Sequence, residues 1–74
     1  MKPDEMEKNK WYKVKGLGVI MIEQAHYRPE SDVYDLLFRE YDGTLKYCIL
    51  TSEAVEDNAI EGPATLDDIM VSEL

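Results

Sequence analysis

The sequence contains a single cysteine, Cys48, and a single histidine, His26. One cysteine excludes an internal disulfide bond, which is typical of proteins in a reducing cytoplasm. One histidine near Glu23, Glu30 and Asp32 does not provide the ligand spacing of a zinc site, and we interpret it as a solvated loop residue. The sequence therefore predicts neither a bound metal nor a cofactor.

Other features that catalysis requires are also missing. Gly16 and Gly18 do not extend into a glycine-rich phosphate-binding loop. Cys48 alternates with apolar neighbours in a predicted strand, so packing explains it better than nucleophilic chemistry, with a Cys48–His26 pair as the minor alternative. A domain of 74 residues has a thin core and little room for a deep substrate pocket. We therefore expect a protein that is not an enzyme.

Long apolar segments are lacking as well. The longest apolar run, residues 19–22, is far too short to cross a membrane. Residues 1–10 are polar and do not resemble a signal peptide. The expected location is the cytoplasm, which would be the host cytoplasm if the chain is phage-encoded.

Positive charge is scarce and unevenly distributed. Sixteen acidic and eight basic residues give a formal net charge of −8. The bases crowd the first fifteen residues, and none follows Lys46. Direct nucleic-acid binding and binding to an anionic membrane are disfavoured, because both require clustered Lys and Arg. The expected partner is a protein with a basic surface, and both a monomer and a dimer remain possible.

The sequence predicts a flexible segment at residues 1–10, with at most one helical turn after Pro3. A single domain at residues 11–74 is expected to follow it. Residues 11–15 and 19–24 are rich in apolar and β-branched side chains and predict strand structure. Gly16 and Gly18 between them indicate a bulge or sharp bend. The unbroken apolar run at residues 19–22 favours a strand covered on both faces. Residues 26–32 and 58–65 are interpreted as loops.

The strongest local pattern is a hairpin of residues 33–41 and 44–51 around Asp42-Gly43, which is typical of a two-residue type I′ turn. That turn pairs Tyr41 with Thr44. It places one set of side chains in the core: Tyr34, Leu36, Phe38, Leu45, Tyr47 and Ile49. The other face then carries Asp35, Leu37, Arg39, Lys46, Cys48 and Leu50. Because this register sets Arg39 opposite Lys46, either nearby carboxylates relieve the repulsion or the register differs.

Residues 52–57 are compatible with a helical turn or with the end of a strand. Thr65 and Asp68 have the spacing of a capping box and predict a short helix over residues 66–74, with an edge strand at 69–71 as the alternative. The predicted fold class is α+β: a small antiparallel sheet of three to five strands with a short helix. The alternative is an SH3-like β-barrel, suggested by Trp11-Tyr12, the bent first strand and the hairpin.

Two short motifs resemble phage-encoded uracil-DNA glycosylase inhibitors. Glu30-Ser31-Asp32-Val33 and Leu50-Thr51-Ser52-Glu53-Ala54 are similar to the Glu-Ser-Asp-Ile and Leu-Thr-Ser-Asp-Ala segments of that family, and they have the same separation. Tyr41-Asp42 occupies a similar place near the intervening turn. The resemblance spans about 25 residues. The family's long first helix and its acidic second helix have no counterpart here, and Asp35 stands where an apolar residue is expected.

The resemblance implies a small acidic inhibitor that imitates DNA. In that family an edge strand carrying a glutamate enters the DNA groove of the enzyme, and an apolar pocket holds a leucine of the enzyme. Glu23 would match the strand glutamate if a gap is allowed, and Leu50 would line the pocket.

The resulting hypothesis is a DNA-mimicking inhibitor of a DNA-processing enzyme, with a uracil-DNA glycosylase as the favoured target. Its expected partner-binding residues are Glu23, Glu30, Asp32, Leu37, Leu50, Glu53, Glu56 and Asp57. The alternative is an SH3-like adaptor module without inhibitory activity. That module would bind its partner through an aromatic groove built from Trp11, Tyr12, Tyr27 and Tyr41.

Overall fold

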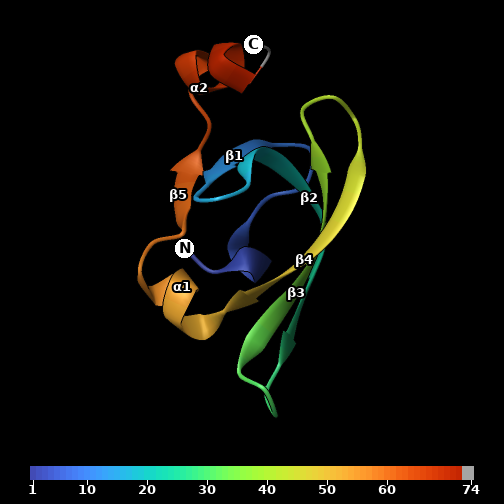
Figure 1. The fold of residues 1–74 in the computed structure, drawn as a ribbon, viewed down its shortest axis with the longest axis vertical. Coiled ribbons are helices and arrows are strands. Elements are labelled where there is room, and N and C mark those ends of the chain that lie inside the picture. The colour runs from blue at the N-terminus through green and yellow to red at the C-terminus, as the bar shows by residue number, and fades with distance from the viewer. Residues whose placement is uncertain (73–74) are drawn as a thin grey trace.

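A five-stranded antiparallel sheet, curved around a short N-terminal turn, forms most of the molecule (Figure 1). The computed structural model describes residues 1–72. The elements in chain order are η1 (Pro3–Glu5), β1 (Trp11–Val14), β2 (Gly18–Arg28), β3 (Val33–Glu40), β4 (Leu45–Thr51), α1 (Ser52–Glu56), β5 (Ile60–Pro63) and α2 (Leu66–Ser72). The strand order is β4-β3-β2-β1-β5. The α+β fold with a small antiparallel sheet is therefore confirmed.

The sheet is open. β4 and β5 are its two edges, and in the described part of the chain no strand pairing joins them. α1 connects these edge strands, which realises the helical alternative for residues 52–57. The sheet therefore does not close into a barrel by strand pairing.

β2 is the central strand, and it is longer than the sequence predicts. His26, Tyr27 and Arg28 pair with β3, so the expectation of a loop at residues 26–32 is wrong for its first half. A bulge at Glu23, between Ile22 and Gln24, shifts the register and bends the strand.

The two glycines before β2 serve the turn that joins it to β1. Their φ angles are +79° at Gly16 and +83° at Gly18, a region that glycine adopts without steric cost. The turn is closed by the Leu17 amide, which donates to the Val14 carbonyl at 3.1 Å. The run at residues 19–22 is largely buried, as its composition predicts.

The β3–β4 hairpin exists, but its predicted register is wrong by one residue. Phe38 lies opposite Lys46, and Arg39 lies opposite Leu45. The loop has three residues: the Gly43 amide donates to the Glu40 carbonyl, and Gly43 has a φ of +91°. This is a type I turn followed by a left-handed glycine, and it uses the same Asp-Gly pair as the type I′ turn.

The one-residue shift exchanges the two faces of β4, because side chains alternate along a strand. Tyr34, Leu36 and Phe38 are buried as predicted, with Cys48 and Leu50 packed against them. Leu45, Tyr47 and Ile49, which were expected in the core, are exposed. The register shift also removes the predicted Arg39–Lys46 pair. Arg39 forms an ion pair with Glu23, and Lys46 forms one with Glu40.

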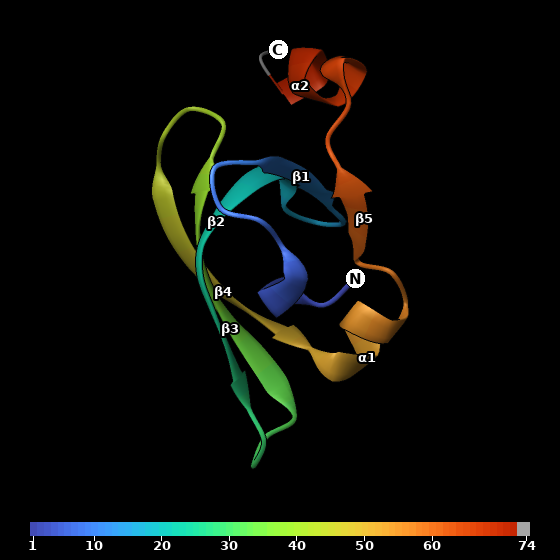
Figure 2. The same ribbon diagram turned by 180° about the vertical axis from the view of Figure 1, so that it is seen from behind.

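The N-terminal segment contributes to the core. The expected single helical turn is η1, which lies inside the curve of the sheet (Figure 2). Pro3 and Met6 are buried, and the Glu7 amide donates to the hydroxyl of buried Tyr12 at 2.8 Å. The domain core therefore begins well before residue 11, where the sequence places its boundary.

The C-terminal region contains one strand that the sequence does not predict. β5 lies within residues 58–65, interpreted above as a loop, and it pairs with β1. Tertiary pairing overrides the weak local preference of a segment that contains Gly62 and Pro63.

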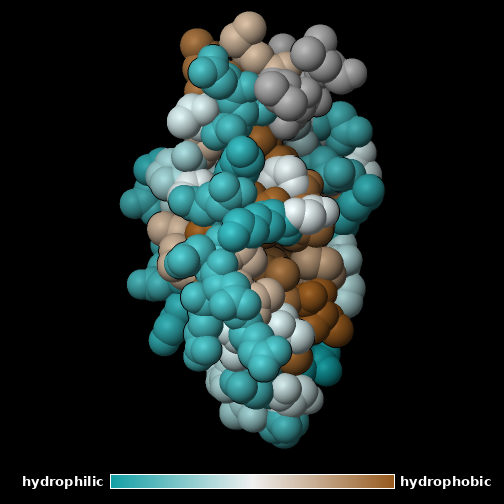
Figure 3. Space-filling model, turned by 60° about the vertical axis from the view of Figure 1, so that its left-hand side comes forward, coloured by the Kyte–Doolittle hydropathy of each residue, from teal (hydrophilic) through white to brown (hydrophobic). Residues whose placement is uncertain are grey.

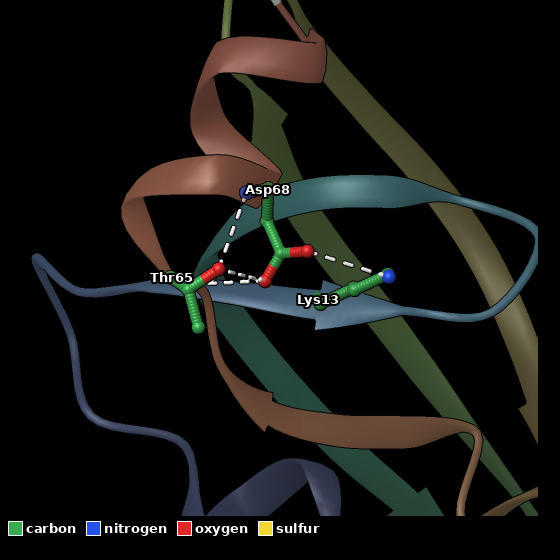
Figure 4. A network of polar contacts seen from close by, with 3 residues as sticks. All are labelled: Lys13, Thr65 and Asp68. Carbon is green, nitrogen blue, oxygen red and sulfur yellow. Dashed lines mark hydrogen bonds and ion pairs between the residues drawn. The ribbon is translucent and has the colours of Figure 1, made fainter.

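The predicted capping box starts α2 (Figure 4). The Asp68 amide donates to Thr65 Oγ1 at 3.2 Å, and the Thr65 amide donates to the Asp68 carboxylate at 2.9 Å. Lys13 on β1 lies 3.4 Å from the same carboxylate. The helical prediction is confirmed as far as Ser72, and its last two residues lie outside the described range.

Candidate functional site

Two segments that carry acidic residues, the β2–β3 turn and α1, are joined by hydrogen bonds although they are far apart in the sequence. Ser52, the first residue of α1, donates from its amide to the Asp32 carbonyl at 3.2 Å and from its hydroxyl to the Asp32 carboxylate at 2.7 Å. These bonds hold the β2–β3 turn beside α1 (Figure 1). We call the exposed carboxylates of this turn and helix the acidic end: Glu30, Asp32, Glu53, Glu56 and Asp57.

Local sequence fixes the direction of α1. Thr51 is its N-cap, and its hydroxyl accepts the Ala54 amide at 3.2 Å. Val55 is buried and anchors the helix to the core, whereas Glu53 and Glu56 remain exposed. A five-residue helix would not be stable alone, so this anchor is what holds its acids in place.

Asp32 is the best-organised carboxylate of the acidic end. Its oxygen accepts hydrogen bonds from the hydroxyl of Tyr27, at 2.5 Å, and from Ser52. The bond from Tyr27, followed by that from Ser52, holds the pKa of Asp32 below its ordinary value. The Asp32 carboxylate is therefore fixed in position and ionised at neutral pH.

A hollow of about 410 Å3 lies beside Asp32. Its walls come from η1, β2, β3 and α1: Lys2, Asp4, Tyr27, Asp32, Tyr34, Ser52, Val55 and Glu56. The rings of Tyr27 and Tyr34 lie 4.9 Å apart between centroids. Lys2, Asp4, Ser52 and Val55 are members that sequence reasoning missed, and Tyr27 was expected only in the aromatic groove of the adaptor hypothesis. No local pattern indicates Lys2 and Asp4, because their proximity to Asp32 depends on the position of η1.

The positive side chains are mostly engaged elsewhere. Ion pairs join Lys10 to Glu7, Lys13 to Asp68, Arg28 to Asp35, Arg39 to Glu23 and Lys46 to Glu40. In the described part of the chain, no ion pair involves a carboxylate of the acidic end. The ammonium of Lys15 lies 3.4 Å from the backbone carbonyl of Asp57. Within residues 1–72 the carboxylates of this end therefore make no direct ion pair, although Lys2 lines the hollow with Asp32 and Glu56, and Arg28 interacts electrostatically with Glu30.

A second, more apolar hollow borders the acidic end. Its volume is about 290 Å3, and its walls are Lys15, Leu50, Ala54, Asp57 and Ala59. Figure 3 shows the α1 and β5 side of the molecule, where hydrophobic side chains are visible between predominantly hydrophilic ones. An apolar side chain of a partner would fit this hollow while the rest of the partner contacts the carboxylates of the acidic end.

Leu37 and Glu23, two of the expected partner-binding residues, lie outside the acidic end and the two hollows. Leu37 is on the outer face of β3, opposite Tyr47, whereas Leu50 packs on the core side of β4. The expectation that Leu37 and Leu50 share a face is wrong because of the register shift. Glu23 lies at the bulge of β2, with its carboxylate 2.9 Å from Arg39.

The aromatic groove of the adaptor hypothesis does not form. Tyr12 is only 1% exposed and belongs to the core. Trp11 contacts Tyr41, with 5.1 Å between ring centroids. Tyr27 contacts Tyr34 instead, far along β2 from the strand position that pairs with Trp11.

The remaining candidate residues are separated by the sheet. His26 lies opposite Asp35 on the outer face, while Cys48 packs against the core, so the Cys48–His26 pair does not form. Burial raises the pKa of the Cys48 thiol. Among residues 1–72, no cluster of three or more His, Cys, Asp or Glu side chains could hold a metal ion. None of the helices described is long and apolar enough to cross a membrane.

Comparisons with protein families, curated proteins and solved structures found no match.

Proposed function

We propose that the chain is a protein inhibitor that imitates DNA, and that its acidic end occupies the basic groove of a DNA-processing enzyme. The observation that carries the proposal is the contact between two acid-bearing segments, residues 30–32 and 52–57, whose carboxylates form no ion pair within the described part of the chain. A uracil-DNA glycosylase is the proposed target, because the two motifs that resemble its inhibitors lie within or beside this end.

In this proposal the charged and the apolar parts of the site contribute to different steps of binding. The exposed carboxylates of the acidic end attract a basic groove over a long range and speed association. The hollow beside Leu50 accepts an apolar side chain, and its burial slows dissociation. The hydrogen bonds between Ser52 and Asp32 fix the geometry before binding, which lowers the entropic cost of association. Action in the cytoplasm, where such enzymes meet DNA, belongs to the same proposal.

The test is a competition assay with a uracil-DNA glycosylase and uracil-containing DNA at ~50 mM and ~200 mM salt. We expect stoichiometric inhibition that weakens at the higher salt concentration. No inhibition at either concentration would eliminate this target, and inhibition that does not change with salt would contradict the mimicry of DNA.

A matched pair of variants tests the site itself. Glu53→Gln/Glu56→Gln removes two charges from the acidic end, and we expect a slower association rate. Glu61→Gln/Asp67→Asn removes the same net charge from exposed positions on β5 and α2, and we expect a much smaller effect. Equal effects of the two variants would show that only net charge matters and that the acidic end is not the binding site.

A further inference from the structure

The two edges of the sheet differ in how well they are protected against pairing with another chain. β5 is short, carries Glu61 and Pro63, and contains Gly62 with a φ of +128°. Such features prevent an edge strand from accepting a further strand. β4 has seven residues, with neither proline, glycine nor an acidic side chain. Although the net charge is −8, this edge carries no negative charge.

β4 also presents apolar side chains to solvent. Leu45, Tyr47 and Ile49 are 48%, 57% and 52% exposed and share the outer face of the sheet. Leu37 lies opposite Tyr47 on the neighbouring strand and extends this apolar surface. Long, exposed, apolar edge strands are templates for β-sheet pairing.

The hairpin contacts show which backbone groups of β4 are available. The Glu40 amide donates to the Thr44 carbonyl at 2.9 Å, so these residues form a hydrogen-bonded pair. Hydrogen-bonded pairs alternate along an antiparallel ladder. Lys46 and Cys48 therefore direct their amides and carbonyls toward β3, while Leu45, Tyr47 and Ile49 direct theirs toward the free edge.

We propose that β4 pairs in antiparallel fashion with β4 of a second copy of this chain, with Cys48 on the two-fold axis. Cys48 is the middle residue of the strand, so this register uses its full length. Tyr47 of each copy lies opposite Ile49 of the other and exchanges both backbone hydrogen bonds with it. The apolar outer faces of the two sheets then become continuous.

Charge favours a second copy in this orientation. Two chains of net charge −8 repel each other, so they approach best through an edge without acids. The antiparallel arrangement directs the two acidic ends away from each other. Lys46 would discourage edge pairing if its ammonium were free, but that group lies 2.8 Å from Glu40 of its own chain. In the pair, the two Lys46 residues are about 13 Å apart along the strands.

The first test is the molar mass in solution, measured by light scattering over a range of protein and salt concentrations. We expect a dimer that strengthens as salt screens the repulsion. Binding of the acidic end to a basic partner weakens with salt, so the two proposals respond in opposite directions and can fail independently. A chain that stays monomeric at high protein and salt concentration overturns the proposed dimer. The same result is expected if β4 pairs only with an extended segment of an unrelated protein, so that case also counts against the proposal.

Ile49→Pro is the discriminating variant. It removes an amide that faces the free edge and leaves the hydrogen bonds to β3 intact. We expect a folded monomer, with its fold verified by circular dichroism. Ile49→Val keeps the amide and should still dimerise. A dimer that persists in Ile49→Pro shows that another surface is used and overturns the proposal.

The register has its own test. Non-hydrogen-bonded antiparallel pairs have Cα atoms about 4.5 Å apart, within the range that a disulfide spans. Oxidation with diamide should therefore link Cys48 to Cys48 of the second copy rapidly, and Ile49→Pro should abolish the rapid reaction. A stable dimer whose Cys48 thiols do not link has a different register from the one proposed.

Discussion

The hydroxyl of Tyr47 on β4 donates a hydrogen bond to the carboxylate of Asp35 on β3, at 2.5 Å. Arg28 on β2 binds the same carboxylate through its guanidinium. Asp35 therefore connects three neighbouring strands on the outer face of the sheet. The bond from Tyr47 is the largest of the influences that hold the pKa of Asp35 below its ordinary value, and Arg28 and His26 act in the same direction.

This contact predicts a pH-dependent contribution to stability. A carboxyl group whose pKa is lower in the folded than in the unfolded chain stabilises the fold above its unfolded pKa, about 4. That contribution is lost as the pH falls through the lower, folded value. Tyr47→Phe should therefore be less stable than the parent at pH 7, with the difference vanishing well below pH 4. Urea unfolding at pH 7 and well below pH 4 measures the difference in unfolding free energy between the variant and the parent. A difference that does not change with pH would contradict the contribution of Asp35.

Core burial predicts a contrast between two leucines on adjacent strands. Leu36 is 0% exposed, and its replacement by alanine should cost about 2–5 kcal/mol of unfolding free energy. Leu45→Ala, at an exposed position, should change stability by less than about 0.5 kcal/mol. Both are measured by urea unfolding at low protein concentration. If Leu36→Ala does not fold, Leu36→Val provides the milder comparison. Equal losses would support the register that the sequence alone predicts.

The hairpin loop predicts a purely conformational penalty at Gly43. Its φ is +91°, and an added Cβ would meet no atom within 4 Å. Gly43→Ala should therefore cost about 1–2 kcal/mol through backbone strain alone. Gly43→Asn should cost less, because asparagine tolerates this region better. If thermal unfolding gives no difference between alanine and glycine, the three-residue loop is not the conformation in solution.

The capping box predicts a local effect. Thr65→Ala removes the hydroxyl that accepts the Asp68 amide, at a cost of about 1 kcal/mol to the helix. Because α2 packs at the end of the sheet, hydrogen exchange should accelerate in α2 while β2 and β3 keep their protection. Thr65→Ser keeps the oxygen and should restore slow exchange. Acceleration throughout the sheet would mean that α2 is required for the whole fold.

The features that could be predicted from the sequence are those that depend on neighbouring residues. The Asp42-Gly43 turn and the Thr65 cap both follow from local hydrogen bonding and backbone preference. The hairpin register did not follow, because two turn types accept Asp-Gly and β4 is apolar on both faces. Composition alone does not show which face of β4 is buried. One face carries Leu45, Tyr47 and Ile49, and the other carries Cys48 and Leu50.

The candidate site shows the same limit. Glu53, Glu56 and Asp57 are close together in any helical turn, so their grouping was predictable. Their proximity to Asp32 depends on contacts between Ser52 and the β2–β3 turn, which no local pattern indicates. The involvement of Asp4 depends in addition on Met6 entering the core.

The pairing of β1 with β5 joins residues near the two ends of the chain, with Tyr12 opposite Pro63. Closing such a long loop is entropically costly, so it should follow the local meander of β2, β3 and β4 during folding. In the chain, α1 lies between β4 and β5. Ala59 follows α1, and its carbonyl accepts a hydrogen bond from the Lys15 amide at 2.8 Å. The hollow beside Leu50 is therefore completed only when β5 docks, and a nascent or truncated chain that lacks β5 should be unable to bind a partner there.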